Sequence, residues 1–161
     1  MIELHDYYMS MALREAQRAM DAGEVPTGCA IIDASAEQRG KSPVLGLAHN
    51  QVEILKDPTA HAEVLAITQA AAALGDWRLT DTVLYVTKEP CVMCAGAIIY
   101  ARIPTVVYGV PDAKRGGHSV FQILDHPGLN HRCDVLPNVR ADESLHMLQL
   151  FFREKRKQKK L

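Results

Sequence analysis

Neither a long hydrophobic run nor a secretory signal is present in this sequence of 161 residues. No stretch approaches the roughly 20 apolar residues that a membrane-spanning helix needs. The N-terminus, MIELHD, also lacks the basic segment and apolar core of a signal peptide. The sequence therefore predicts a cytoplasmic protein that does not associate with a membrane.

Cysteine is scarce, because the chain has only four. In a reducing compartment these side chains are expected to be thiols or metal ligands, which excludes a disulfide framework as the basis of the fold. The apolar fraction of 48% and the charged fraction of 23% are those of an ordinary globular protein. Internal repeats, low-complexity stretches and linkers are missing as well. We therefore expect one domain over residues 1–161.

Charge of one sign is not in excess overall, since the formal net charge is −1. The basic residues are nevertheless concentrated at one end: residues 153–161, the basic C-terminal tail, contain six basic side chains and one acidic one. Such a run is typical either of a solvated helix end or of a segment that binds phosphates. The sequence leaves both interpretations open.

Hydrophobic periodicity predicts helices that alternate with short strands. Apolar residues at three- and four-residue steps predict a surface helix over 4–20 that Gly23 ends, and an apolar pattern predicts a buried helix from Ala60 to Leu74 with Asp57 as its N-cap. We further expect strands at 29–32, 44–48, 82–87, 105–108 and 133–136, and helices at 90–101, 120–124 and 142–157. This order favours an α/β fold in which a five-stranded mixed sheet has helices on both faces.

Two short segments, His61-Ala62-Glu63 and Pro90 to Cys94, contain the residue types of a catalytic metal site. Cys91 and Cys94 are three residues apart at a predicted helix start, so their sulfurs can converge on one ion together with His61. The helix dipole at that end favours the thiolates. Three protein ligands leave the fourth position of a zinc ion to water, as in catalytic sites. Glu63 can then move the protons of that water without being a ligand.

Neither segment is specific when it stands alone. A Cys-x-x-Cys pair also occurs in redox sites and as half of a zinc ribbon, and a histidine on an apolar helix is often a core residue. The spacing of Cys29 and Cys133 cannot supply the second pair of a zinc ribbon, and a redox site would not account for Glu63. Together, His-x-Glu and Pro-Cys-x-x-Cys form the signature of zinc-dependent nucleobase deaminases. The sequence therefore predicts a hydrolytic deaminase.

Further motifs extend this pattern over most of the chain. They include DPTAHAE at 57–63, LYVTKEPCVMCAGAI at 84–98, DHPGLNHR at 125–132 and Phe-Phe-Arg at 151–153. With these motifs the chain resembles the bacterial tRNA-specific adenosine deaminases of the TadA type, in the cytidine-deaminase-like superfamily. The resemblance implies a three-layer α/β/α cytidine-deaminase-like fold, a homodimer, one zinc ion per subunit, and conversion of adenosine to inosine at the wobble position of a tRNA anticodon.

The resemblance also implies five substrate contacts. Asn50 would bind the flipped base or its ribose, and Glu24 would lie at the edge of the pocket. Asp112, Phe152 and Arg153 would contact neighbouring nucleotides, since phenylalanine can stack on a splayed base and arginine can bind phosphate. From the residues alone, a turn residue is the alternative interpretation of Asn50, and at least one phenylalanine of the Phe-Phe pair can belong to the core.

Departures from the family pattern lie mainly in one loop. Residues 112–119 are one residue shorter than the pattern, His118 stands where glycine is expected, Pro111 is unusual, and Lys88 replaces an apolar or neutral residue. These departures bear on the substrate and not on the metal. Two other functions therefore stay open: deamination of a free nucleobase or nucleotide such as guanine, cytosine or dCMP, and a non-catalytic zinc-bearing subunit of an editing complex. The presence of Glu63 argues against the second.

Overall fold

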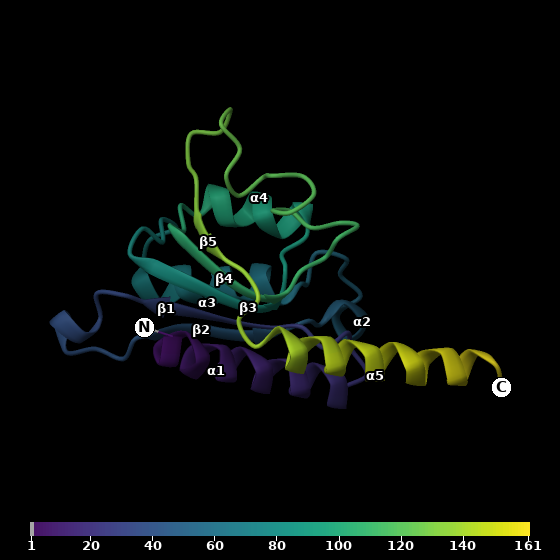
Figure 1. Cartoon of the computed structure of the whole chain (residues 1–161). Helices are drawn as coiled ribbons and strands as arrows, with labels where there is room; N and C mark the ends of the chain where they lie inside the picture. Colours follow the sequence, from purple (N-terminus) through teal and green to yellow (C-terminus); the bar gives the residue numbers. More distant parts are fainter. Residues whose placement is uncertain (1) are drawn as a thin grey trace.

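The computed structural model describes residues 2–161 as a sheet between two layers of helices (Figure 1). None of its helices is both long and apolar enough to cross a membrane. In chain order the elements are α1 (Ile2–Asp21), β1 (Gly28–Asp33), the 3-10 helix η1 (Glu37–Arg39), β2 (Val44–His49), α2 (Val52–Leu55), α3 (Ala62–Leu74), β3 (Thr82–Lys88), α4 (Val92–Tyr100), β4 (Thr105–Val110), β5 (Asp134–Leu136) and α5 (Ala141–Lys159).

The five strands form one mixed sheet in the order β2-β1-β3-β4-β5. β1 is antiparallel to both β2 and β3, whereas β3, β4 and β5 are parallel. The parallel pair β3 and β4 is connected through α4, as a parallel pair requires a crossover. The predicted α/β class with a five-stranded mixed sheet is thus confirmed.

Both faces of the sheet are covered, which explains why its central strands are apolar nearly throughout. The row Cys29, Val86 and Tyr108 runs across β1, β3 and β4 and packs in the core under α3 and α4. The next row, Ala30, Tyr85 and Val107, points to the opposite face. There it packs against α1, and α5 lies beside α1 on the same side (Figure 1). These are the three layers expected of the fold.

Two glycines hold α1 in this position. Gly23 has a φ of +77° and follows the end of α1, in the conformation that glycine adopts without a steric penalty. Gly28 starts β1 directly against the helix, where an added Cβ would lie 1.9 Å from the carbonyl oxygen of Ala12. Only glycine therefore allows α1 to approach the sheet this closely.

Several local expectations were wrong. The segment 120–124 does not form a helix, because Gln122 has a positive φ of 54° and the Ile123 amide bonds back six residues to the Gly117 carbonyl. α3 begins at Ala62 and not at Ala60, since the Asp57 carboxylate accepts a hydrogen bond from the Thr59 amide in a separate turn. The short helix α2 was not expected. The first two of these segments lie next to the site, because one belongs to the loop that follows β4 and the other places His61 directly before α3.

Candidate functional site

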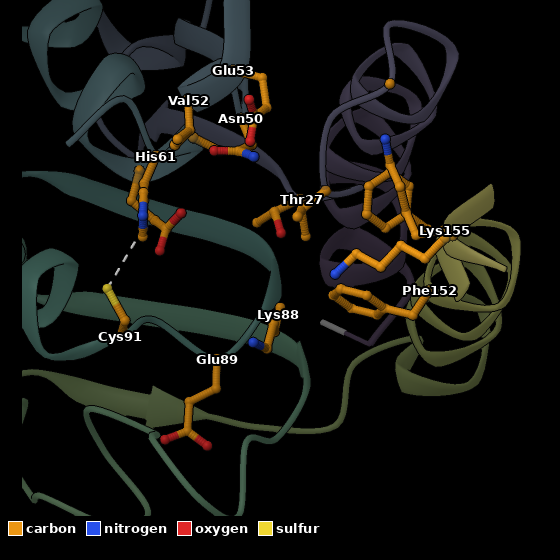
Figure 2. Close-up of a pocket in the computed structure, with 16 residues that line it drawn as sticks. Thr27, Asn50, Val52, Glu53, His61, Lys88, Glu89, Cys91, Phe152 and Lys155 are labelled. Atoms are coloured by element: carbon orange, nitrogen blue, oxygen red, sulfur yellow. Dashed lines mark hydrogen bonds between the residues drawn. The ribbon is translucent and has the colours of Figure 1, made fainter. Parts of the chain in front are cut away.

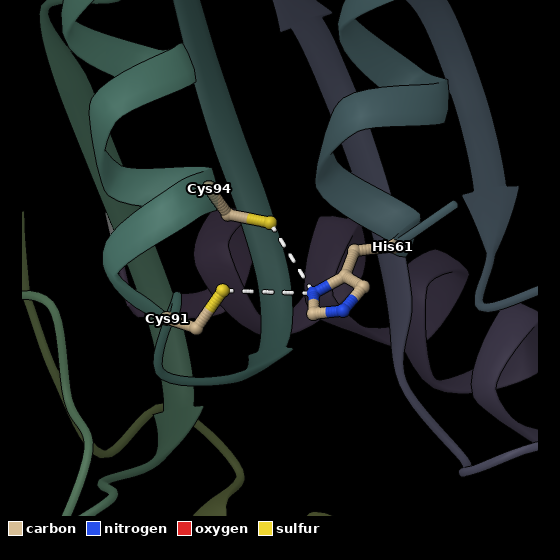
Figure 3. A group of neighbouring side chains, drawn as sticks. All are labelled: His61, Cys91 and Cys94. Atoms are coloured by element: carbon tan, nitrogen blue, oxygen red, sulfur yellow. Dashed lines mark hydrogen bonds between the residues drawn. The ribbon is translucent and has the colours of Figure 1, made fainter. Parts of the chain in front are cut away.

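The structure brings His61, Cys91 and Cys94 together, as Figure 3 shows. Both sulfurs lie 3.6 Å from Nδ1 of His61, and the three potential ligand atoms are all within 4.8 Å of one another. Zinc bonds of about 2.3 Å to sulfur and about 2.0–2.1 Å to nitrogen, at tetrahedral angles, would separate sulfur from nitrogen by about 3.6 Å. The cluster therefore has the dimensions of a site for one zinc ion.

Local backbone geometry aims these side chains at one another. His61 and Cys91 are the residues just before α3 and α4, and both are extended, with ψ angles of 152° and 177°. Neither side chain caps its own helix, so both are free to point across the gap between the two helix starts. Cys94 lies in the first turn of α4, and its side chain is fully buried.

The cluster already favours one thiolate without a metal. A hydrogen bond from the Cys94 thiol lowers the pKa of Cys91 to about 3, and the same bond raises the pKa of Cys94. The Cys91 sulfur also raises the pKa of His61 through their hydrogen bond. A thiolate next to an imidazole and a second thiol is a donor set that suits zinc, which binds sulfur and nitrogen and deprotonates a coordinating thiol.

Glu63 lies in the first turn of α3 and is only 3% exposed. Burial raises the pKa of its carboxyl group. Its Oε1 is buried and has no hydrogen-bond partner among the described residues. A buried carboxylate oxygen in this state is costly unless a group from outside the chain satisfies it. The carboxyl group is therefore suited to meet water or a substrate N–H in the pocket.

These groups open onto a pocket of about 550 Å³ (Figure 2). His61 and Cys91 lie on one side of it, and Phe152 and Lys155 of α5 lie across from them. The pocket therefore joins the start of α3 to the second half of α5. Its lining residues are Gly23, Val25, Thr27, Asn50, Val52, Glu53, His61, Ala62, Glu63, Lys88, Glu89, Cys91, Phe151, Phe152, Lys155 and Lys159.

Two of the five expected substrate residues lie in this pocket. Asn50 is 8% exposed, and its backbone amide donates to the Thr27 carbonyl, which fixes it at the end of β2. Phe152 is 45% exposed, whereas the neighbouring Phe151 is buried. One phenylalanine of the pair thus packs in the core while the other presents its ring to the pocket.

The other three have partners elsewhere or lie outside the pocket lining. Glu24 is buried and accepts hydrogen bonds from the Glu53 amide at the start of α2. Asp112 accepts two amide hydrogen bonds from its own loop and forms an ion pair with Lys88. Arg153 lines a separate surface groove on α5. Their contacts with nucleotides stay predictions.

Sequence reasoning missed Glu89, which is 3% exposed beside Cys91. Its carboxylate accepts five hydrogen bonds, all from Asp112, His118 and Ser119. Burial acts to raise the pKa of Glu89, but the bonds from Ser119, Asp112 and His118 outweigh it and lower the pKa. Glu89 thus fastens the loop 112–119 to the start of α4. A charged residue at the end of an apolar strand was the available signal.

Comparison with known proteins agrees with this geometry. The family model of the MafB19-like deaminases matches residues 3–156. A tRNA-specific adenosine deaminase of Streptococcus pyogenes serotype M3 is 42% identical over 161 residues, which cover 99% of this chain and 90% of the relative. Another, from Aquifex aeolicus, is 44% identical over 154 residues, with coverages of 94% and 95%.

A solved structure gives the same result. It comes from studies of A-to-I editing by tRNA:A34 deaminases at the wobble position of transfer RNA, and it superposes with a TM-score of 0.80 at 38% identity. The match covers 88% of this chain and 99% of the other. Sequence motifs, fold and relatives are thus consistent with one another. The chain therefore belongs to the MafB19-like deaminases and, among them, to the family of the tRNA-specific adenosine deaminases.

Proposed function

We propose that this protein is a cytoplasmic enzyme that converts adenosine to inosine at the wobble position of a tRNA anticodon, with one zinc ion per subunit. The observation that carries this proposal is the cluster of His61, Cys91 and Cys94 at the wall of the pocket, where Oε1 of Glu63 has no hydrogen-bond partner among the described residues. Zinc bound by these three residues would act as a Lewis acid that lowers the pKa of water to about 7.

Glu63 would carry the protons of the reaction. Its free Oε1 accepts a proton from water as the water oxygen bonds to C6 of adenine, and the same carboxyl group then protonates N1. A second proton goes from the added hydroxyl through Glu63 to the amine, the C6–N bond breaks, and ammonia leaves as inosine forms. The raised pKa of Glu63 suits this exchange, because an efficient proton shuttle has a pKa near the working pH.

Asn50 and Phe152 would hold the substrate. The target base has to leave its stack to enter a closed pocket. Asn50, on the pocket wall, can hydrogen-bond the base or its ribose. The exposed ring of Phe152 offers a face on which a neighbouring base can stack, an interaction that is worth about 1–3 kcal/mol per base.

The proposed substrate can be tested directly. Incubation of the zinc-loaded protein with an anticodon stem-loop that has adenosine at the wobble position should give inosine at that position. Mass spectrometry of the digested RNA detects the product. Guanine, cytosine and dCMP serve as competing substrates in parallel. Ammonia release from one of these, without inosine in the RNA, would show a deaminase of small free substrates instead.

We also propose that the protein is a homodimer joined through the exposed side of α4. Tyr100 is 77% exposed and Val92 is 47% exposed. Tyr100 borders a groove of about 470 Å³, whose lining also includes Ile99, Ile123 and Leu129. Exposed apolar surface of this kind is typical of a protein interface.

Sedimentation equilibrium should therefore give twice the chain mass of 17.8 kDa for the native protein. The variant Tyr100→Glu should sediment as a monomer, because it places a charge in the apolar contact. Leu4→Glu, which changes an exposed residue of α1, should remain dimeric. A monomeric native protein would disprove the dimer.

A further inference from the structure

One face of α5 is buried in the first part of the helix and carries lysines beside the pocket in the second part. Ser144, Leu148 and Phe151 follow one another at three- and four-residue steps and are all buried. Lys155 and Lys159 continue the same face at four-residue steps, and both line the pocket. Both lysines are exposed, so this part of the basic C-terminal tail borders the pocket while it stays open to solvent.

Lys88 adds a third ammonium group from the end of β3. Its side chain is 37% exposed, and it lines the same pocket. Figure 2 shows Lys88 between His61 on one side and Phe152 with Lys155 on the other. Lysines from two distant parts of the chain thus meet at one pocket, and we call Lys88, Lys155 and Lys159 the lysine wall.

The charge of the lysine wall is largely unneutralised. Among the described residues, the only carboxylate within ion-pair distance of these three side chains is that of Asp112, 3.0 Å from Lys88. The amides of Lys114 and Arg115 both donate to Oδ1 of Asp112, so Oδ2 is left to Lys88. Lys88 would therefore meet a phosphate as the partner of Asp112, whereas Lys155 and Lys159 have no carboxylate partner among the described residues.

Three acidic residues line the same pocket, namely Glu53, Glu63 and Glu89, and among the described residues none of these three forms an ion pair with the wall. The carboxylate of Glu89 is occupied by backbone amides of the loop 112–119. Lys155 lies 5.5 Å from the ring centre of Phe151, a cation–π contact that favours its position beside the pocket. The pocket thus combines two cations without a carboxylate partner, Lys155 and Lys159, and the paired cation Lys88 with the exposed ring of Phe152.

We propose that the lysine wall binds a backbone phosphate of a single-stranded polynucleotide, next to the nucleotide whose base enters the pocket. This inference rests on the proposed function and adds the group that is recognised beyond the base. A phosphate is a compact anion that lysine binds as a point charge, and a free nucleobase has none. Lys88 stands where the family resemblance predicts a neutral residue, so this contact is a feature of this chain.

The test measures the salt dependence of RNA binding. Each phosphate contact on a single strand contributes about 0.7 to the slope of log K against log salt concentration. Fluorescence anisotropy with zinc-loaded Glu63→Gln protein and a labelled anticodon stem-loop, from about 50 to 200 mM salt, gives this slope without turnover. We expect Lys88→Met and Lys155→Met each to lower the slope by at most about 0.7, because the wall neutralises a single phosphate.

Lys157→Met is the matched control. Lys157 is on the same helix, pairs with Glu154 at 3.3 Å and is absent from the pocket lining, while its replacement removes the same charge. Its slope should stay close to that of the parent protein. Equal slopes for all three variants would overturn the lysine wall, because they would reflect only the general attraction of a basic helix.

Inosine formation by the native protein in the same RNA tests the proposed function separately. If the native protein forms inosine but all three variants have equal slopes, the proposed function is supported and the lysine wall is disproved. If the protein neither forms inosine nor binds the RNA in a salt-dependent way, both proposals are disproved. Lys88→Arg and Lys155→Arg, which keep the positive charge, should retain the slope of the parent protein, and this assigns the loss in the methionine variants to the missing charge.

Discussion

Replacing Glu63 by glutamine is expected to reduce deamination by about 10²–10⁴-fold while the protein keeps its metal. Glutamine has nearly the same shape, but its amide cannot take and return a proton. Because Glu63 is not one of the three clustered ligands, the site for the ion should persist. Steady-state inosine formation gives the loss in kcat, and elemental analysis gives the zinc content of the same sample.

Asp76→Asn is the control for this experiment. Asp76 is an exposed acid after the end of α3, and among the described residues its carboxylate bonds only to the neighbouring Arg78. This variant also replaces an acid by its amide, and its kcat and zinc content should equal those of the native protein. A Glu63→Gln protein with native activity would refute the assigned role, whereas loss of zinc in that variant would show that the carboxylate helps to hold the metal.

Replacing Cys91 by serine is expected to remove the zinc, the activity and part of the stability at once. A hydroxyl group is a poor zinc ligand compared with a thiolate. Metal binding to the folded state alone adds about 4 kcal/mol to stability at a free zinc concentration 1,000 times the Kd. Zinc should therefore raise the urea midpoint of the native protein and leave that of Cys91→Ser unchanged. A chelator should lower the native midpoint toward the value of the variant.

Cys133→Ser separates the loss of a ligand from the loss of a cysteine. Cys133 is buried outside the cluster, and its thiol donates to the Ile103 carbonyl, a bond that a serine hydroxyl can also make. This variant should bind one equivalent of zinc and respond to it like the native protein. Stoichiometric zinc and full activity in Cys91→Ser would contradict the assigned metal site.

Some features of the site could not be predicted because they depend on contacts between distant segments. Glu89 is only two residues before Cys91 in the sequence, yet its five hydrogen bonds come from residues 23 to 30 positions further along the chain. The carboxylate of Asp112 is shared by its own loop and by Lys88, a pairing that the sequence did not indicate. For Glu89 the only available signal was a charged residue at the end of an apolar strand, which does not reveal its partners.

Local patterns, in contrast, determined the strands, most of the helices and the identity of the clustered residues. Alternation and helical periodicity act over a few residues, and His-x-Glu and Cys-x-x-Cys owe their meaning to spacing at a helix start. What only the tertiary structure decided is that α5 returns across the sheet and brings Phe152 and Lys155 opposite His61. Phe152 and His61 are some 90 positions apart in the chain. The physical reason is that they come together only when whole helix faces are buried against the sheet, and no short stretch of residues encodes such packing.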